Sequence, residues 1–222
     1  MIEIDGKQVF SELHELVAPA HTALVVVDLQ RDFCAPGWAF VRLGVDLSMY
    51  PPLIPRVSRL VERARAADVR VVYLQMTALP DGASDSPAQL RFNLRLSHLA
   101  RERTGEPLSY TRDGSPGQEM LDELAPQPGD LVVKKYRSSG FWGTNLDLLL
   151  RSNGIKTVIV CGCTTEGCVE STARDAMFND YYVVIAEDCV ASDDPAQHEA
   201  SLLLMRHRFD LASAEAILGV WP

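Results

Sequence analysis

The sequence is short of positive charge. Its 21 lysine and arginine residues stand against 30 aspartate and glutamate residues, which gives a formal net charge of −9. An acidic protein repels phosphate backbones and anionic lipid headgroups, so we expect no nucleic-acid partner and no membrane partner. Long apolar runs are also lacking, and residues 1–10 do not have the basic and apolar pattern of a secretory leader. We expect a soluble, cytoplasmic protein.

Cysteine is scarce and odd in number. Five cysteines in 222 residues argue against a disulfide framework and favour reduced thiols. A zinc site made of Cys161, Cys163 and Cys168 is a weak alternative, because two of them fall at the end of a predicted strand and no fourth Cys or His is near in the sequence. We expect no metal and no cofactor.

Apolar runs typical of strands alternate with segments of helical spacing. Strands are predicted at residues 23–28, 69–75, 131–133, 155–161, 181–186 and 211–212, and helices at residues 53–67, 145–152, 169–178 and 195–207. The alternation predicts an α/β fold of three αβα layers, with a doubly wound, mostly parallel sheet of about six strands. We expect a single domain over residues 1–222.

Residues 79–117 depart from this alternation. The segment is polar and rich in Gly, Pro, Ser and Asp, and it contains one stretch, residues 88–103, with helical spacing. We interpret it as an insertion that lies over the edge of the sheet or extends toward a neighbouring subunit.

Three polar residues occur at or just past the ends of predicted strands. They are Asp28, Lys135 and Cys168. In an open parallel sheet, ligands bind in the crevice outside the carboxyl ends of the strands. Cys168 also lies at the start of a predicted helix, where unpaired N–H groups and the helix dipole favour a thiolate. An acid, an amine and a thiol in one crevice would form a nucleophile with a base and an electrostatic partner.

Three motifs resemble those of the isochorismatase-like cysteine hydrolases. The segment at residues 25–33, Val-Val-Val-Asp-Leu-Gln-Arg-Asp-Phe, is similar to the opening motif of that family. Residues 135–146 resemble its lysine motif, in which the lysine stands six residues before a phenylalanine, and residues 162–176 resemble its nucleophile motif. The motifs occur in the family's order, and the resemblance spans roughly residues 22–221.

The resemblance implies an Asp28–Lys135–Cys168 triad. Asp28 would take the thiol proton, Lys135 would hold Asp28 and favour the thiolate, and Cys168 would attack a carbonyl carbon to form a thioester. The N–H groups of Thr164 and Cys168 would form the oxyanion hole, and a cis peptide is implied between Cys163 and Thr164. The family also implies a homodimer or homotetramer. The neighbouring Lys134 competes for the lysine role, but the spacing to Phe141 selects Lys135.

The resemblance also bears on the substrate. The first loop, residues 32–40 followed by residues 44–48, looks like that of the branch that hydrolyses ureido and carbamoyl compounds, including ureidoacrylate and biuret amidohydrolases. The Gly-Cys-Thr-Thr-x-Gly-Cys turn at residues 162–168 looks like that of N-carbamoylsarcosine amidohydrolases. A small linear amide or ureido substrate is expected, bound by Gln30, Phe33, Phe141, Thr164 and Thr165, with Trp38 a further aromatic wall. Candidates for a carboxylate clamp are Arg42, Arg91, Arg95 and Arg137.

Three functions remain open at this point. The first is a cysteine amidohydrolase that cleaves a C–N bond and releases ammonia or an amine. The second is an isochorismatase-type vinyl-ether hydrolase, which needs no thiol and is therefore disfavoured by Cys168. The third is a non-catalytic scaffold that binds a ligand, which would not require all three triad residues. A metal-dependent nicotinamidase is disfavoured, because residues 75–79 lack the Asp-x-His-x-x-His pattern of that branch.

Overall fold

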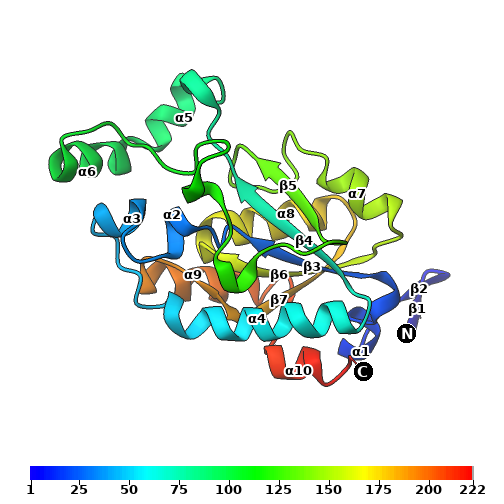
Figure 1. Cartoon of the computed structure of the whole chain (residues 1–222). Coiled ribbons are helices and arrows are strands. Elements are labelled where there is room, and N and C mark those ends of the chain that lie inside the picture. Colours follow the sequence, from blue (N-terminus) through cyan, green and yellow to red (C-terminus); the bar gives the residue numbers. More distant parts are fainter. Residues whose placement is uncertain (222) are drawn as a thin grey trace.

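The computed structural model describes residues 1–221, so the last residue of the predicted domain, 222, lies outside the described residues. Its centre is a six-stranded parallel sheet with the strand order β5-β4-β3-β6-β7-β8 (Figure 1). The strands are β3 (Thr22–Val27), β4 (Arg70–Met76), β5 (Leu131–Lys135), β6 (Thr157–Cys163), β7 (Tyr182–Ala191) and β8 (Asp210–Ala212). All six predicted strands are present, with ends shifted by a few residues.

Helices cover both faces of the sheet. The α-helices within residues 1–221 are α1 (Leu13–Leu16), α2 (Arg31–Cys34), α3 (Ala39–Arg42), α4 (Tyr50–Ala66), α5 (Pro87–Phe92), α6 (Leu94–Thr104), α7 (Leu146–Ser152), α8 (Glu170–Phe178), α9 (Pro195–Met205) and α10 (Ala214–Leu218). Buried residues of α4 and α10 form one core with the sheet, and those of α7, α8 and α9 form a second core on the other face. The predicted three-layer α/β fold is therefore confirmed. No helix within residues 1–221 combines the length and the apolar character that a membrane crossing needs.

The order in which the chain adds strands to the sheet changes direction between β3 and β6. From β3 the strands proceed through β4 to β5 on one side, and from β6 through β7 to β8 on the other. Neighbouring strands therefore send their connections to opposite faces, which leaves a crevice at the carboxyl ends of β3 and β6. The residues that follow these two strands are Asp28 and the turn that leads to Cys168.

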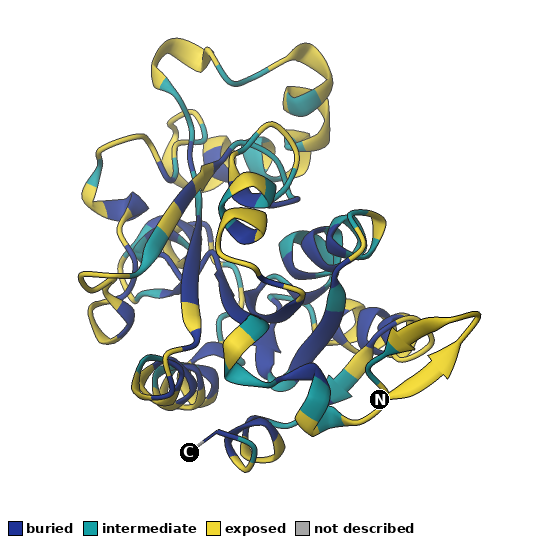
Figure 2. Ribbon diagram, turned by 90° about the vertical axis from the view of Figure 1, so that its right-hand side faces the viewer, coloured by how far each residue is buried: buried dark blue, intermediate teal, exposed yellow. Residues whose placement is uncertain are grey.

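Two elements differ from the sequence prediction. An antiparallel hairpin, β1 (Ile2–Ile4) and β2 (Lys7–Val9), precedes the domain core and is exposed (Figure 2). Its turn, Asp5-Gly6, has a positive φ at both residues, as tight hairpin turns require. The helical stretch predicted at residues 88–103 is two helices, α5 and α6, interrupted at Asn93, and together they stand away from the sheet (Figure 1).

Candidate active site

Asp28 follows β3 directly and is almost fully buried, with 1% of its surface exposed. Its backbone adopts a left-handed conformation, φ 51°, and its N–H donates to Leu74 O of β4 at 3.1 Å. On the side chain, Oδ1 accepts the backbone N–H of Met76 at 3.1 Å. These bonds to the end of β4 fix the carboxylate at the crevice rather than in solvent.

Lys135 is the last residue of the edge strand β5 and reaches the crevice across β4. Its side chain is fully buried, on the same face as Val133, whereas Lys134 points the other way and pairs with Asp113 at the surface. β5 lies two strands from β3, a separation of roughly 10 Å, so only a long side chain bridges it. The alternation of a β-strand therefore separates the two lysines, and Lys135 is the one at the crevice.

The ammonium group of Lys135 contacts both other triad residues. Lys135 Nζ lies 2.8 Å from Asp28 Oδ2 and 3.2 Å from Cys168 Sγ, and it donates to Arg137 O at 3.1 Å. The cation thus sits between an acid and a thiol and is held in place by a backbone carbonyl. The structure brings the three predicted triad residues together.

A glycine allows the turn after β6 to reach this position. Gly162 has φ +115°, and a Cβ on it would lie 2.1 Å from Val27 O, so no other residue fits against β3 there. The next peptide, Cys163–Thr164, is cis. Residues Thr165–Val169 then form one π-helical turn, which contains Cys168 and leads into α8. Cys168 therefore lies just before the α-helix rather than at its first residue.

Burial and the neighbouring charges act in opposite directions on the pKa values of the site. Burial raises the pKa of Cys168 to about 12; the nearby Lys135 charge lowers that pKa, and the Asp28 charge raises it. Burial likewise raises the pKa of Asp28, although Lys135 opposes the shift. Burial alone would lower the pKa of Lys135, but Asp28 and Cys168 together raise it above its ordinary value. Burial therefore favours the uncharged forms of Asp28 and Cys168, and the Lys135 charge favours an anion at either group.

A cavity of about 390 Å³ opens above the triad. Its lining residues are both apolar and polar: Asp28, Phe33, Phe40, Met76, Gln89, Phe92, Asn93, Leu96, Tyr110, Ser138, Cys163, Thr164, Glu166, Gly167, Cys168, Asp193 and Gln197. The insertion at residues 79–117 supplies five of them, from Gln89 to Tyr110. It therefore forms a wall of the cavity, a position that its sequence did not indicate.

Of the five predicted substrate-binding residues, Phe33 and Thr164 line this cavity. Gln30 does not, because its amide donates to Met76 O and Gln118 O and accepts the N–H of Met76. Gln30 instead holds the loop after β3 to the end of β4.

Phe141 and Thr165 also lie outside the cavity. The Phe141 ring packs on Tyr181, 5.9 Å between ring centroids, and its loop is tied to α8 by the Gly140 N–H bond to Thr172 Oγ1. Thr165 is fully buried and its hydroxyl bonds His198 Nδ1 at 2.8 Å. Both residues stabilise the motifs that carry them, and the structure does not bring them to the cavity wall.

The predicted arginine clamp and the further aromatic wall are not at the cavity either. None of Arg42, Arg91, Arg95 and Arg137 lines it, and Trp38 stacks under Arg31 instead. Arg137 donates to Ser84 O and lies over the Trp142 ring. Two carboxylates that line the cavity, Glu166 and Asp193, were not predicted from the sequence.

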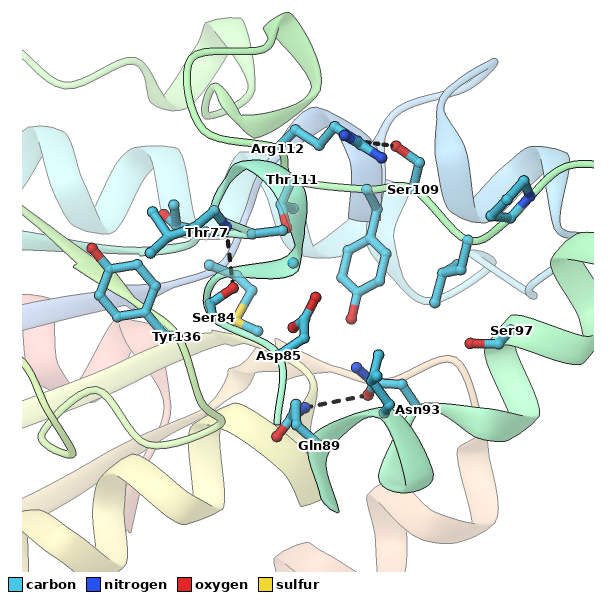
Figure 3. Close-up of a pocket in the computed structure, with 18 of the residues that line it drawn as sticks. Thr77, Ser84, Asp85, Gln89, Asn93, Ser97, Ser109, Thr111, Arg112 and Tyr136 are labelled. Atoms are coloured by element: carbon cyan, nitrogen blue, oxygen red, sulfur yellow. Dashed lines mark hydrogen bonds between the residues drawn. The ribbon is translucent and has the colours of Figure 1, made fainter. Parts of the chain in front are cut away.

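A larger cavity, about 470 Å³, lies beside the first (Figure 3). It is enclosed by the insertion and the ends of β4 and β5, and Thr77, Asp85, Arg112 and Tyr136 are among its lining residues. The two cavities share Met76, Gln89, Asn93 and Tyr110, but none of the triad residues lines the larger one.

The cysteines weighed as zinc ligands are divided between the two cores. Cys161 and Cys163 pack into the core beneath α4, and Cys168 packs against the other one. Within residues 1–221, no group of three or more His, Cys, Asp or Glu residues is arranged to hold a metal ion.

Comparisons with known proteins give consistent matches. The family model of the isochorismatase domain matches residues 22–215. Ureidoacrylate amidohydrolase RutB of Methylobacterium radiotolerans is 36% identical over 214 residues, covering 91% of this chain and 81% of that protein. A cysteine hydrolase from Pseudomonas syringae pv. phaseolicola has a TM-score of 0.76 at 28% identity, covering 92% of this chain and 94% of its own. N-carbamoylsarcosine amidase from Thermoplasma acidophilum has a TM-score of 0.66 at 28% identity, covering 88% and 97%.

Proposed function

The chain belongs to the isochorismatase family, and on that premise we propose that it is a cysteine-dependent amidohydrolase. Its reaction would be cleavage of a C–N bond in a small linear amide, ureido or carbamoyl compound. The observation that carries the proposal is the position of Lys135 Nζ within reach of both Asp28 and Cys168 beneath one cavity. The relatives named as amidohydrolases support the reaction class, a hydrolase acting on C–N bonds.

The geometry supports a reaction in two halves. As Cys168 Sγ attacks the carbonyl carbon, its proton passes to Asp28, and Lys135 stabilises the negative charge that remains on the pair. The carbonyl oxygen becomes an oxyanion, which the N–H groups of Thr164 and Cys168 would hold. Asp28 then gives its proton to the departing nitrogen, which leaves as ammonia or an amine.

The second half of the reaction regenerates the thiol. Water attacks the thioester, or the thiocarbamate where the substrate is a urea, and Asp28 takes its proton. The sulfur leaves and recovers a proton from Asp28, so the site returns to its starting state. Burial raises the pKa of both Asp28 and Cys168, which suits a cycle in which a proton passes between them.

The two alternative functions fit the cavity less well. A vinyl-ether hydrolase needs the acid but not the thiol, whereas Cys168 lines the cavity and contacts Lys135. A ligand-binding scaffold has no need of a fully buried lysine that pairs with a buried acid, which is costly to desolvate. The proposed amidohydrolase mechanism uses Asp28, Lys135 and Cys168.

Three narrower proposals accompany this function. Phe33 and Thr164 would contact the substrate, since both line the cavity. Residues 1–222 would form one domain, which is supported by a single family model over residues 22–215. The homodimer or homotetramer implied by the family stays a prediction. Trp142, which is 64% exposed, would lie in the interface between subunits.

Ammonia release tests the proposal. The assay covers ureidoacrylate, biuret, N-carbamoyl amino acids, maleamate and nicotinamide, with the wild type, Cys168→Ala and Cys168→Ser. We expect at least one amide to be hydrolysed and the activity to fall by about 10⁴-fold or more in both variants, because the nucleophile is gone. Cys189→Ala, a change at a buried cysteine outside the cavity, is the matched control and should stay active. Normal turnover by Cys168→Ala would overturn the mechanism.

A further inference from the structure

The cavity above the triad carries an excess of negative charge. Glu166 and Asp193 line it in addition to Asp28, and within residues 1–221 no lysine, arginine or histidine does. The charge of Asp28 is balanced by Lys135, which lies behind it and is fully buried. Glu166 and Asp193 have no such partner at the cavity wall.

Glu166 is the better placed of the two carboxylates. It stands two residues before Cys168 on the same π-helical turn, so the fold fixes it beside the nucleophile. Its Oε2 atom is buried without a hydrogen-bond partner, and the side chain forms no ion pair or hydrogen bond with any residue in the range 1–221. A buried carboxylate oxygen that the protein leaves unsatisfied is free to accept a hydrogen bond from a ligand.

Asp193 faces the same space because its neighbour takes the structural role. Asp194 caps α9 by accepting the N–H groups of Ala196 and Gln197, which leaves Asp193 to line the cavity. Burial raises the pKa of Asp193, and the nearby charge of Glu166 raises it further, so the two carboxyl groups are close. Arg95 opposes this shift, but it lies on the wall of an adjacent cavity and does not line this one.

We propose that Glu166, supported by Asp193, determines which substrates the cavity accepts. The group beyond the scissile bond is an uncharged hydrogen-bond donor, such as a second amide or urea, or a cation such as an ammonium group. A carboxylate at that position is disfavoured, since like charges meet without an intervening cation. The inference rests on the proposed function for its substrate chemistry, but the charge preference of the cavity is measurable without it.

Charged thiol reagents measure that preference directly at Cys168. Aminoethyl and sulfonatoethyl methanethiosulfonate modify thiols by the same reaction and differ in the sign of the terminal charge. The other four cysteines are buried, so the partly exposed Cys168 is the site that reacts, and mass spectrometry identifies it. We expect the cationic reagent to be favoured by about tenfold after normalisation to a small free thiol, and Glu166→Gln to remove most of that preference.

The matched control is Glu62→Gln, which makes the same charge change on the exposed side of α4, away from the cavity. It should leave the reagent ratio unchanged, which separates a local effect of Glu166 from the overall charge of −9. Asp193→Asn should reduce the ratio by a smaller factor and covers the case in which Glu166→Gln fails to fold. A ratio equal to that of the free thiol, or one that neither variant alters, would overturn the proposal.

Amide hydrolysis provides the second readout. The ratio of kcat/KM between a neutral urea and its carboxylate-bearing analogue should fall by about tenfold in Glu166→Gln, because the repulsion is removed. A reagent preference without hydrolysis of any amide would leave the charge inference standing and remove the proposed function. Hydrolysis that requires Cys168 and favours the carboxylate analogue would support the proposed function and overturn the charge inference.

Discussion

The triad end of the cavity is buried and tied to the sheet, whereas the wall that the insertion supplies is more exposed and packs on a small separate core with α2 and α3. Asp28 and Lys135 are at most 1% exposed and bond to the ends of β4 and to each other. On the facing wall, α5 and α6 stand away from the sheet, and Phe92 is 74% exposed although it lines the same cavity.

The difference separates two tasks. The parallel sheet positions the reacting groups, because strand order and register leave each of them little freedom. The insertion would surround the rest of the substrate; α6 and Tyr110 are held by a small core shared with Phe33 and Phe40, whereas α5 is mostly exposed. Changes on the triad side should therefore affect chemistry and stability together, and changes on the exposed helix α5 should affect substrate binding alone.

The largest effect should come from Asp28→Asn. The substitution keeps the shape of the side chain and removes the proton acceptor, so we expect kcat to fall by about 10³-fold. Thermal unfolding monitored by circular dichroism checks that the variant folds, since Lys135 loses its counter-charge. Retention of more than a tenth of the wild-type kcat would show that Asp28 is not the base.

The pH dependence of the wild type distinguishes proton transfer from a merely structural role of Asp28. Burial raises the pKa of Asp28 above the ordinary aspartate value. The protonated carboxyl cannot accept the thiol proton, so kcat should fall as the pH falls through this raised pKa. Any residual activity of Asp28→Asn should lack that acidic limb.

Lys135→Met should come next; it should lower activity, because the charge on the pair loses its cation, and it should also lower stability. The variant keeps most of the side-chain length but leaves Asp28 as a buried acid without a partner, which costs about 3 kcal/mol of unfolding free energy. Lys134→Met is the matched control, because the neighbouring lysine pairs with Asp113 at the surface and should cost about 0.5 kcal/mol. Urea unfolding measures both.

The double variant Asp28→Asn/Lys135→Met sharpens this prediction. It removes both charges, so it should regain a large part of the stability lost in Lys135→Met. Equal unfolding free energies for the two single lysine variants would contradict the assignment of Lys135 as the buried partner of Asp28.

The division between the sheet and the insertion also explains which features could be predicted from the sequence. The apolar runs before Asp28 and before Cys168 are long enough to identify central strands. The carboxyl ends of parallel strands all lie at the same edge of the sheet, where ligands bind. The choice of Lys135 over Lys134 needed only the motif spacing, and strand alternation provides the physical reason. A periodic sequence pattern therefore predicts where a residue lies along a strand and which face of the sheet it occupies.

Side-chain direction in the loops was predicted poorly. Gln30, two residues past Asp28, turns back to bond the backbone at Met76, and Phe141 turns toward Tyr181. Their directions follow from loop conformations and from partners remote in the sequence, neither of which a periodic pattern encodes. Glu166 and Asp193 were missed for the opposite reason, because nothing in the fold uses them and no local pattern marks a free carboxylate.

The smallest effect should come from Phe92→Ala on the insertion. The ring lines the cavity but is mostly exposed, so its loss should raise KM by about fivefold and leave the free energy of unfolding within about 0.5 kcal/mol of the wild type. Phe33→Ala is the contrasting variant, because Phe33 lines the same cavity from the triad side and packs on Phe40 at 4.8 Å. It should lower both stability and activity. If Phe92→Ala destabilised the fold as much as Phe33→Ala, the insertion would be part of the core, and the division between a rigid catalytic end and a separately held substrate wall would fail.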